Sequence, residues 1–87
     1  MTDKEELERV RQRVIHTLRN LKDKYRITTI TTKSDNSFSF YPDKVKLEFG
    51  ELFLEITTLS DITISLYYDD IYYIQQGIMP DIETVLS

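Results

Sequence analysis

The stretch VKLEFGELFLEITTLSDITISLYY, residues 45–68, decides the fold that this sequence predicts. Apolar and polar residues alternate along it, a pattern typical of half-buried β-strands. Gly50 and Glu51 fit a two-residue hairpin loop with glycine first, and residues 59–61 fit a three-residue loop. We therefore expect three consecutive antiparallel strands that share one apolar face.

The register of these strands follows from keeping the apolar residues on that face, because a slip of a single residue reverses the two faces. The first loop pairs Phe49 with Leu52, Leu47 with Leu54, and Val45 with Ile56. The second loop pairs Ile56 with Ile64, Leu54 with Leu66 and, on the outer face, Phe53 with Tyr67.

The segment before this stretch predicts a helix and two further strands. Residues 3–25 carry apolar side chains at steps of three and four, which indicates one long amphipathic helix. Residues 26–33 are rich in β-branched side chains and predict a strand in which either Ile27 or Ile30 points inward. Residues 37–41 predict the strand that follows.

A turn at Pro42 connects these strands to the opening stretch and pairs Phe40 with Val45. The apolar face of the strands needs a cover, and the N-terminal helix offers the matching apolar surface. The expected fold is therefore α+β. It is one domain, residues 1–87, with the long N-terminal helix packed on one face of a four- to five-stranded antiparallel meander.

The C-terminal segment gives two conflicting signals. An aspartate cap at Asp69 or Asp70 and isoleucines at helical spacing favour a short helix over residues 69–76. The residue types Ile-Tyr-Tyr-Ile are instead typical of a strand. The spacing receives more weight, and a helical first turn at Pro80 follows. We therefore expect one or two short C-terminal helices.

The composition excludes several classes of protein. The sequence has no cysteine, one histidine (His16) and two glycines, so it contains no thiolate metal site and no glycine-rich phosphate loop. We expect neither a signal peptide nor a membrane-spanning run. We therefore expect a soluble cytoplasmic protein that is not an enzyme, with no catalytic residue, cofactor or metal, and with no membrane partner.

The motif Tyr67-Tyr68-Asp69-Asp70 resembles the Tyr-x-Asp-Asp hairpin of reverse transcriptase palms, where adjacent carboxylates hold divalent metal. That resemblance implies two-metal chemistry, which needs a further carboxylate on a neighbouring strand. It covers about eleven residues, and a chain of 87 residues is too short for a palm with fingers. We therefore interpret the motif as a strand end followed by an aspartate cap and do not carry the activity over.

The remaining function is binding to a protein partner. Four of the six tyrosines lie within residues 67–73, around two aspartates, and tyrosine is favoured at protein interfaces. We expect Tyr68 and one of the later tyrosines to pack against the sheet. The proposed partner-binding residues are Phe53, Tyr67, Asp69, Asp70, Tyr72 and Tyr73.

The charge is divided unevenly along the chain. Residues 1–33 hold nine lysines and arginines against five acidic residues, whereas residues 34–87 hold two against ten. The acidic half favours a basic partner, and the lack of alanine indicates an AT-rich genome. The hypothesis in its concrete form is an inhibitor, encoded by a phage or mobile element, of a host defence or nucleic-acid enzyme. Homo-oligomer formation through an outer face or edge strand is compatible with it.

The alternative hypothesis is a small nucleic-acid-binding protein that uses the basic N-terminal helix. Its candidate residues are Arg9, Arg13, Arg19, Lys22, Lys24 and Arg26. These residues are scattered around the helical wheel, whereas phosphate binding requires a contiguous basic surface. Nucleic acid is therefore a less favoured partner than protein.

Overall fold

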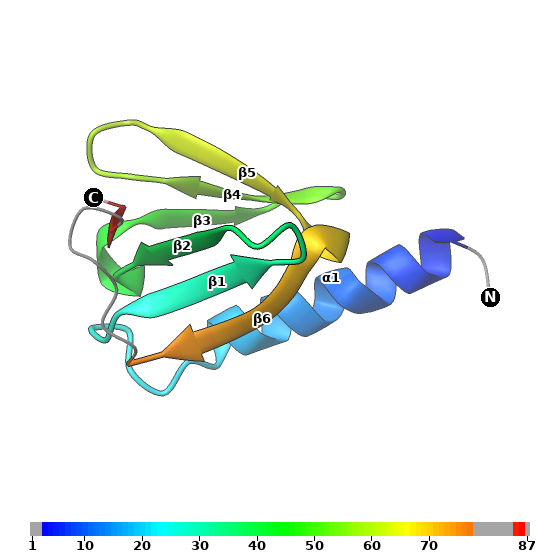
Figure 1. The fold of residues 1–87 in the computed structure, drawn as a ribbon, viewed down its shortest axis with the longest axis horizontal. Coiled ribbons are helices and arrows are strands. Elements are labelled where there is room, and N and C mark those ends of the chain that lie inside the picture. The colour runs from blue at the N-terminus through cyan, green and yellow to red at the C-terminus, as the bar shows by residue number, and fades with distance from the viewer. Residues whose placement is uncertain (1–2, 78–84, 87) are drawn as a thin grey trace.

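The computed structural model describes residues 3–77 and 85–86. These residues form an α+β structure that contains one α-helix, seven strands and two 3-10 helical turns (Figure 1). The elements in chain order are α1 (Asp3–Arg19), β1 (Thr28–Thr32), β2 (Ser37–Phe40), η1 (Pro42–Lys44), β3 (Lys46–Phe49), β4 (Phe53–Thr57), β5 (Thr63–Tyr67), η2 (Tyr68–Asp70), β6 (Ile71–Gln76) and β7 (Val85–Leu86).

The helix α1 forms where the apolar spacing predicted one, and it buries Val14, Ile15 and Leu18. It ends at Arg19, so the expected extension to Tyr25 is wrong. The side-chain amide of Asn20 donates to the His16 carbonyl oxygen at 2.7 Å, and the Asp23 carboxylate accepts from the Tyr25 N–H at 2.8 Å. Such local side-chain bonds compete with the helical backbone pattern and stop the helix.

The strands form two sheets instead of the expected single meander. One sheet has the order β6-β1-β2-β7, and the other has the order β3-β4-β5. The predicted pairing of Phe40 with Val45 is wrong, because β2 pairs with β1 and, in parallel, with β7. Pro42 begins η1 at this point, and the Asp43 N–H donates to the Lys24 carbonyl oxygen at 3.1 Å. The chain therefore turns away before β3 begins.

The two hairpins of the opening stretch differ in how well their register was predicted. In the β4–β5 pair, Ile56 lies opposite Ile64 and Phe53 opposite Tyr67, as the sequence predicted. In the β3–β4 pair, Phe49 lies opposite Leu54 instead of Leu52, a shift of two residues. A shift of two keeps every side chain on its own face. It places Leu52 in the loop, where 52 % of its surface is exposed.

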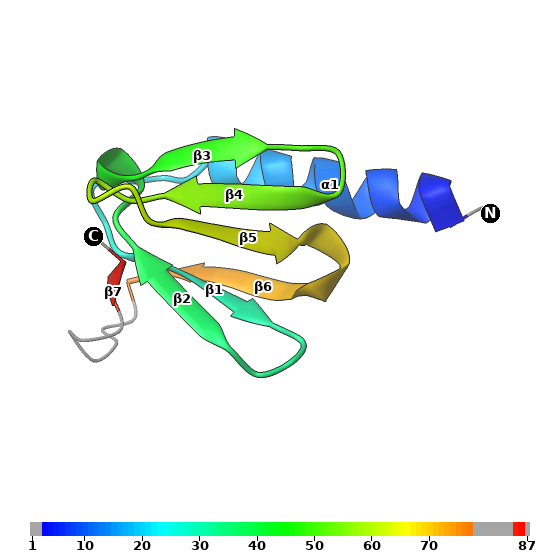
Figure 2. The ribbon, with the colours of Figure 1, turned by 90° about the horizontal axis from the view of Figure 1, so that it is seen from above.

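The hydrophobic core lies between α1 and the inner faces of both sheets. Figure 2 shows α1 behind β3 and β4, on the side opposite the viewer. Ile30 belongs to the core, and Ile27 is buried as well. The fully or nearly buried members of the core cluster are Val14, Leu18, Ile30, Phe40, Leu54, Ile56, Leu66, Tyr68 and Ile71.

The expected helix over residues 69–76 is wrong, because Ile71–Gln76 is the strand β6, paired antiparallel with β1. Thr32 lies opposite Ile71 and Thr31 opposite Tyr73, so Tyr72 is an extra residue in a β-bulge. Because of this extra residue, Ile71 and Ile74, which are three positions apart, point to the same side of the strand. The bulge therefore explains why this strand carries the apolar spacing of a helix. The second C-terminal helix was expected at Pro80, which lies outside the described residues.

Candidate functional site

The first exposed aromatic pair lies on the outer face of the β3-β4-β5 sheet. The rings of Phe53 and Tyr67 meet edge to face, with centroids 5.7 Å apart and an interplanar angle of 79°. The Tyr67 side chain is exposed, and Phe53 is half-buried. The two residues are directly opposite each other in the ladder, which is the position that the register predicted for them. Edge-to-face contact fixes both rings on the surface.

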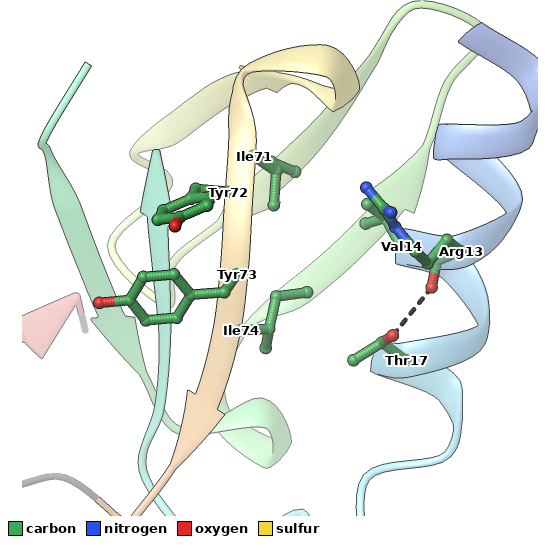
Figure 3. Close-up of a pocket in the computed structure, with 7 residues that line it drawn as sticks. All are labelled: Arg13, Val14, Thr17, Ile71, Tyr72, Tyr73 and Ile74. Atoms are coloured by element: carbon green, nitrogen blue, oxygen red, sulfur yellow. Dashed lines mark hydrogen bonds between the residues drawn. The ribbon is translucent and has the colours of Figure 1, made fainter. Parts of the chain in front are cut away.

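The second exposed aromatic pair is formed by Tyr72 and Tyr73 on β6. Their ring centroids are 5.0 Å apart at an interplanar angle of 69°. Regular alternation would place two consecutive residues on opposite faces of the strand. The bulge instead places both rings on the side away from α1, whereas Ile71 and Ile74 point toward the helix (Figure 3). Both tyrosines are therefore available to a partner, contrary to the expectation that one of them would pack.

The turn η2 connects the strands that carry the two pairs, and its two aspartates differ in environment. Asp69 is exposed. The Asp70 carboxylate accepts a hydrogen bond from the Ser34 hydroxyl at 3.4 Å, and its carbonyl oxygen accepts from the Lys33 N–H at 2.7 Å. Asp70 therefore ties η2 to the β1–β2 loop, and Asp69 is the carboxylate that faces solvent.

Tyr68 lies between these exposed residues in sequence but is fully buried, as expected. Its hydroxyl donates to the Gly50 carbonyl oxygen at 2.8 Å, and Arg11 Nε donates to the same oxygen at 2.8 Å. One carbonyl thus joins η2, the β3–β4 loop and α1. Burial raises the pKa of the Tyr68 phenol, because a phenolate in this environment would lose its hydration.

The outer face of β1 and β2 carries hydroxyl groups beside the second aromatic pair. Thr29 and Ser39 share a hydrogen bond of 2.8 Å across the ladder, and Thr31 and Ser37 share one of 3.3 Å. Thr31 also lies opposite Tyr73 on β6. Thr29, Thr31 and Ser39 are buried, so these bonds support the sheet beside the aromatic pair, and sequence reasoning did not predict them. The signal for them was present in the threonines of residues 26–33, of which Thr29 and Thr31 lie on that face, whereas Thr28 and Thr32 share the inner face with Ile30.

The basic residues of the alternative hypothesis gather only in part. The Arg19 guanidinium lies 5.3 Å from the centroid of the Phe49 ring, and the Lys24 ammonium lies 5.4 Å from that of Tyr25. Arg13 lines a cavity between α1 and β6, and Lys22 lines another, beside the end of α1. Arg19 and Lys24 line that same cavity together with Lys22, so three of the six candidates gather beside the end of α1, whereas Arg13 lies on the other cavity.

The described residues also lack a group of carboxylates suited to metal. Within residues 3–77 and 85–86, no three or more His, Asp or Glu side chains gather into a cluster that could hold a metal ion. The palm-like motif at Asp69 and Asp70 therefore lacks, within these residues, the neighbouring carboxylate that two-metal chemistry requires.

Comparison with known protein families, with curated proteins and with solved structures finds no match to this chain. A search of the described segments for a helix both long and apolar enough to span a bilayer also finds none. The geometry of the site therefore carries the functional conclusion.

Proposed function

We propose that this protein is a non-enzymatic binding module that contacts a protein partner through its two outer aromatic pairs and Asp69. The observation that carries the proposal is the opposite placement of neighbouring tyrosines. Tyr67 is 59 % exposed and Tyr72 is 66 % exposed, whereas Tyr68 between them is fully buried. Tyr68 thus packs in the core, whereas Tyr67 and Tyr72 present most of their surface to solvent.

The paired arrangement of the rings supports a role in binding. Large aromatic side chains supply much of the binding energy in protein interfaces, and they are most effective when little conformational freedom is lost on association. The edge-to-face contacts of Phe53 with Tyr67 and of Tyr72 with Tyr73 already restrict these rings. A partner would therefore meet a surface that is ordered before it binds.

The charge around the aromatic pairs indicates the chemistry of the partner. Glu48 and Glu55 lie directly opposite each other on the outer face that also carries Phe53, where Lys46 pairs with Glu48 at 2.9 Å, and Asp69 is exposed on η2. An acidic, aromatic surface complements a basic one, and such complementarity speeds association. A basic groove of a nucleic-acid or host-defence enzyme is the concrete partner of this kind, which makes the protein an inhibitor in the proposal.

An affinity capture from the source organism tests the proposal. The wild-type protein is compared with the double variant Tyr67→Ala/Tyr72→Ala, and the captured proteins are quantified by mass spectrometry. Tyr25→Ala is the matched control, because Tyr25 and Tyr72 are both tyrosines with 66 % exposed surface. We expect a partner that the wild type and the control retain and the double variant loses. Retention of the same partners by all three proteins would refute the aromatic pairs as the interface.

A further inference from the structure

The strand β6 has one side on which no strand is paired. It stands at the end of the order β6-β1-β2-β7, so among the described residues only β1 pairs with it. The Gly77 N–H donates to the Ile27 carbonyl oxygen at 3.0 Å, which fixes the alternation of the ladder. Tyr73 and Gln75 therefore bond to β1, and the backbone N–H and C=O groups of Ile74 and Gln76 point to the open edge.

Apart from the bulge at Tyr72, this edge lacks the features that usually protect an edge strand. Its sequence, IYYIQQ, contains neither a proline nor a charged residue, and at six residues it is the longest strand in the described part of the chain. Exposed edges of this kind pair readily with another extended chain unless they are blocked. The bulge at Tyr72 leaves the part of the edge at Ile74 and Gln76 in regular register.

A cavity of about 280 Å³ lies beside this edge, between β6 and α1 (Figure 3). Val14, Ile71 and Ile74 provide apolar lining, Tyr72 and Tyr73 add to it from β6, and Arg13 and Thr17 line it from α1. The volume falls just below the usual range for sites that enclose a small molecule, which begins at roughly 300 Å³. It suits a side chain of a chain that runs along the edge better than a complete cofactor.

The helix side of this cavity carries a positive charge without a partner. In the part of the chain that the structure describes, the Arg13 guanidinium makes no ion pair or hydrogen bond, although its carbonyl oxygen accepts from the Thr17 hydroxyl at 2.9 Å. Figure 3 shows the Arg13 side chain extending from α1 toward β6. Arg9 is four residues earlier, so it lies on the same face of the helix.

We propose that an extended, acidic segment of a partner protein adds to the edge of β6 as a further strand. Its backbone bonds to the N–H and C=O groups of Ile74 and Gln76, and one apolar side chain enters the cavity beside Ile71. A carboxylate on the segment pairs with Arg13, which provides a fork of donors that fits a carboxylate. Strand addition next to a helix is a recurring mode of peptide recognition, with side-chain pockets giving specificity.

This site adjoins the aromatic surface of the proposed function but differs from it in the residues that test it. Tyr72 and Tyr73 also line the cavity, although their rings point away from α1, so β6 belongs to both surfaces (Figure 3). Tyr67, on β5 of the other sheet, belongs to the aromatic surface alone, and Arg13 belongs to the edge site alone, so Tyr67→Ala and Arg13→Glu test the two proposals separately. The failure of one proposal leaves the other open to its own test.

A random peptide library displayed on phage provides the probe. It is selected on the wild-type protein, and the enriched peptides are synthesised and titrated against Arg13→Glu and against Lys22→Glu. The second variant makes the same charge reversal at an exposed residue beyond the end of α1. We expect peptides rich in β-branched residues with an Asp or Glu, whose affinity falls about tenfold or more in Arg13→Glu. Lys22→Glu should leave the affinity unchanged.

Amide hydrogen exchange then locates the bound peptide. In the free protein the Ile74 amide should exchange faster than the Gln75 amide, which already bonds to β1, and the peptide should slow exchange at Ile74 and Gln76. Equal peptide affinity for Arg13→Glu and the wild type would overturn the proposal, as would enrichment of no peptide. Slower exchange at Ile74 with rising protein concentration alone would also overturn it, because a second copy would then occupy the edge.

Discussion

The Gly50 carbonyl is the contact whose energy can be worked out most directly, and Tyr68→Phe is the substitution that probes it. The change removes only the hydroxyl from a side chain that is fully buried. The hydroxyl donates to the Gly50 oxygen at 2.8 Å, and Arg11 Nε donates to the same oxygen at 2.8 Å. After the substitution the carbonyl oxygen therefore still has a donor.

The expected cost follows from that second donor. A hydrogen bond contributes about 0.5–1.5 kcal/mol net when its loss leaves no partner unsatisfied, and the penalty rises to about 1–3 kcal/mol when a buried group is orphaned. Because Arg11 keeps the Gly50 oxygen paired, Tyr68→Phe should lower the free energy of unfolding by about 1 kcal/mol. For a domain of this size that corresponds to a decrease in Tm of roughly 4–8 °C.

Urea unfolding of Tyr68→Phe, Arg11→Met and the double variant measures the effect. With both donors removed, the Gly50 oxygen loses every partner that the structure gives it. The double variant should therefore be less stable than the two single losses predict, by about 0.5 kcal/mol or more. Tyr67→Phe is the control, because Tyr67 is exposed and its hydroxyl has no hydrogen bond in the described structure. Additive losses of unfolding free energy, or equal losses for Tyr67→Phe and Tyr68→Phe, would refute the claim that Tyr68 and Arg11 share the Gly50 carbonyl as acceptor.

Three further predictions concern stability. The folded state raises the pKa of Tyr68, so the stability that this residue adds is complete below about pH 10, the unfolded value, and is lost as pH rises through the raised folded value. The urea concentration at the unfolding midpoint should therefore decrease as the pH rises above that value, and it should decrease less steeply for Tyr68→Phe. Identical pH dependence in the two proteins would contradict the burial of the phenol. Gly77→Ala should cost about 1–2 kcal/mol in thermal melts, because Gly77 has φ of +88° and an added Cβ would meet the Arg26 side chain; an unchanged Tm would be inconsistent with that backbone. Glu55→Lys should stabilise the protein by roughly 0.2–1 kcal/mol at low salt, because Glu55 lies directly opposite Glu48; a gain that persists in concentrated salt would argue against an electrostatic cause.

The fold was predictable from sequence where local pattern and loop length agree. The β4–β5 register follows from the odd loop and the alternation of residues 53–67, and the structure confirms its cross-strand pairs. Alternation alone cannot separate registers that differ by two residues, because both keep the same face. The bonds from Arg11 and Tyr68 to Gly50 join residues 39 and 18 positions apart, and no local pattern signals them.

The local sequence pattern also could not predict the division into two sheets or that residues 71–76 form the strand β6. The spacing of Ile71 and Ile74 is that of a helix, and it arises in a strand only because a bulge at Tyr72 adds a residue. The pairing of β6 with β1 spans more than forty residues, since Thr28 lies opposite Gln76. The residue types Ile-Tyr-Tyr-Ile did favour a strand, so propensity was here the better guide than spacing.

The candidate site was predictable to a similar extent. The Phe53 and Tyr67 pair follows from the register alone, and the burial of Tyr68 follows from its place at the end of the strand. The pairing of Tyr72 with Tyr73 depends on the bulge and could not be derived from alternation. The cavity that Arg13 lines beside β6 emerges only when the helix and the edge strand are placed next to each other.

The affinity of the captured partner for tyrosine variants tests the central claim, that the outer aromatic pairs are the binding surface. Isothermal titration calorimetry compares the wild type with Tyr67→Ala and with the control Tyr25→Ala, which makes the same truncation at another exposed tyrosine. The loss of a hot-spot aromatic costs about 2 kcal/mol or more, which is roughly a thirtyfold weaker Kd. We predict that loss for Tyr67→Ala and an unchanged Kd for Tyr25→Ala. Equal affinities for both variants and the wild type would contradict the claim.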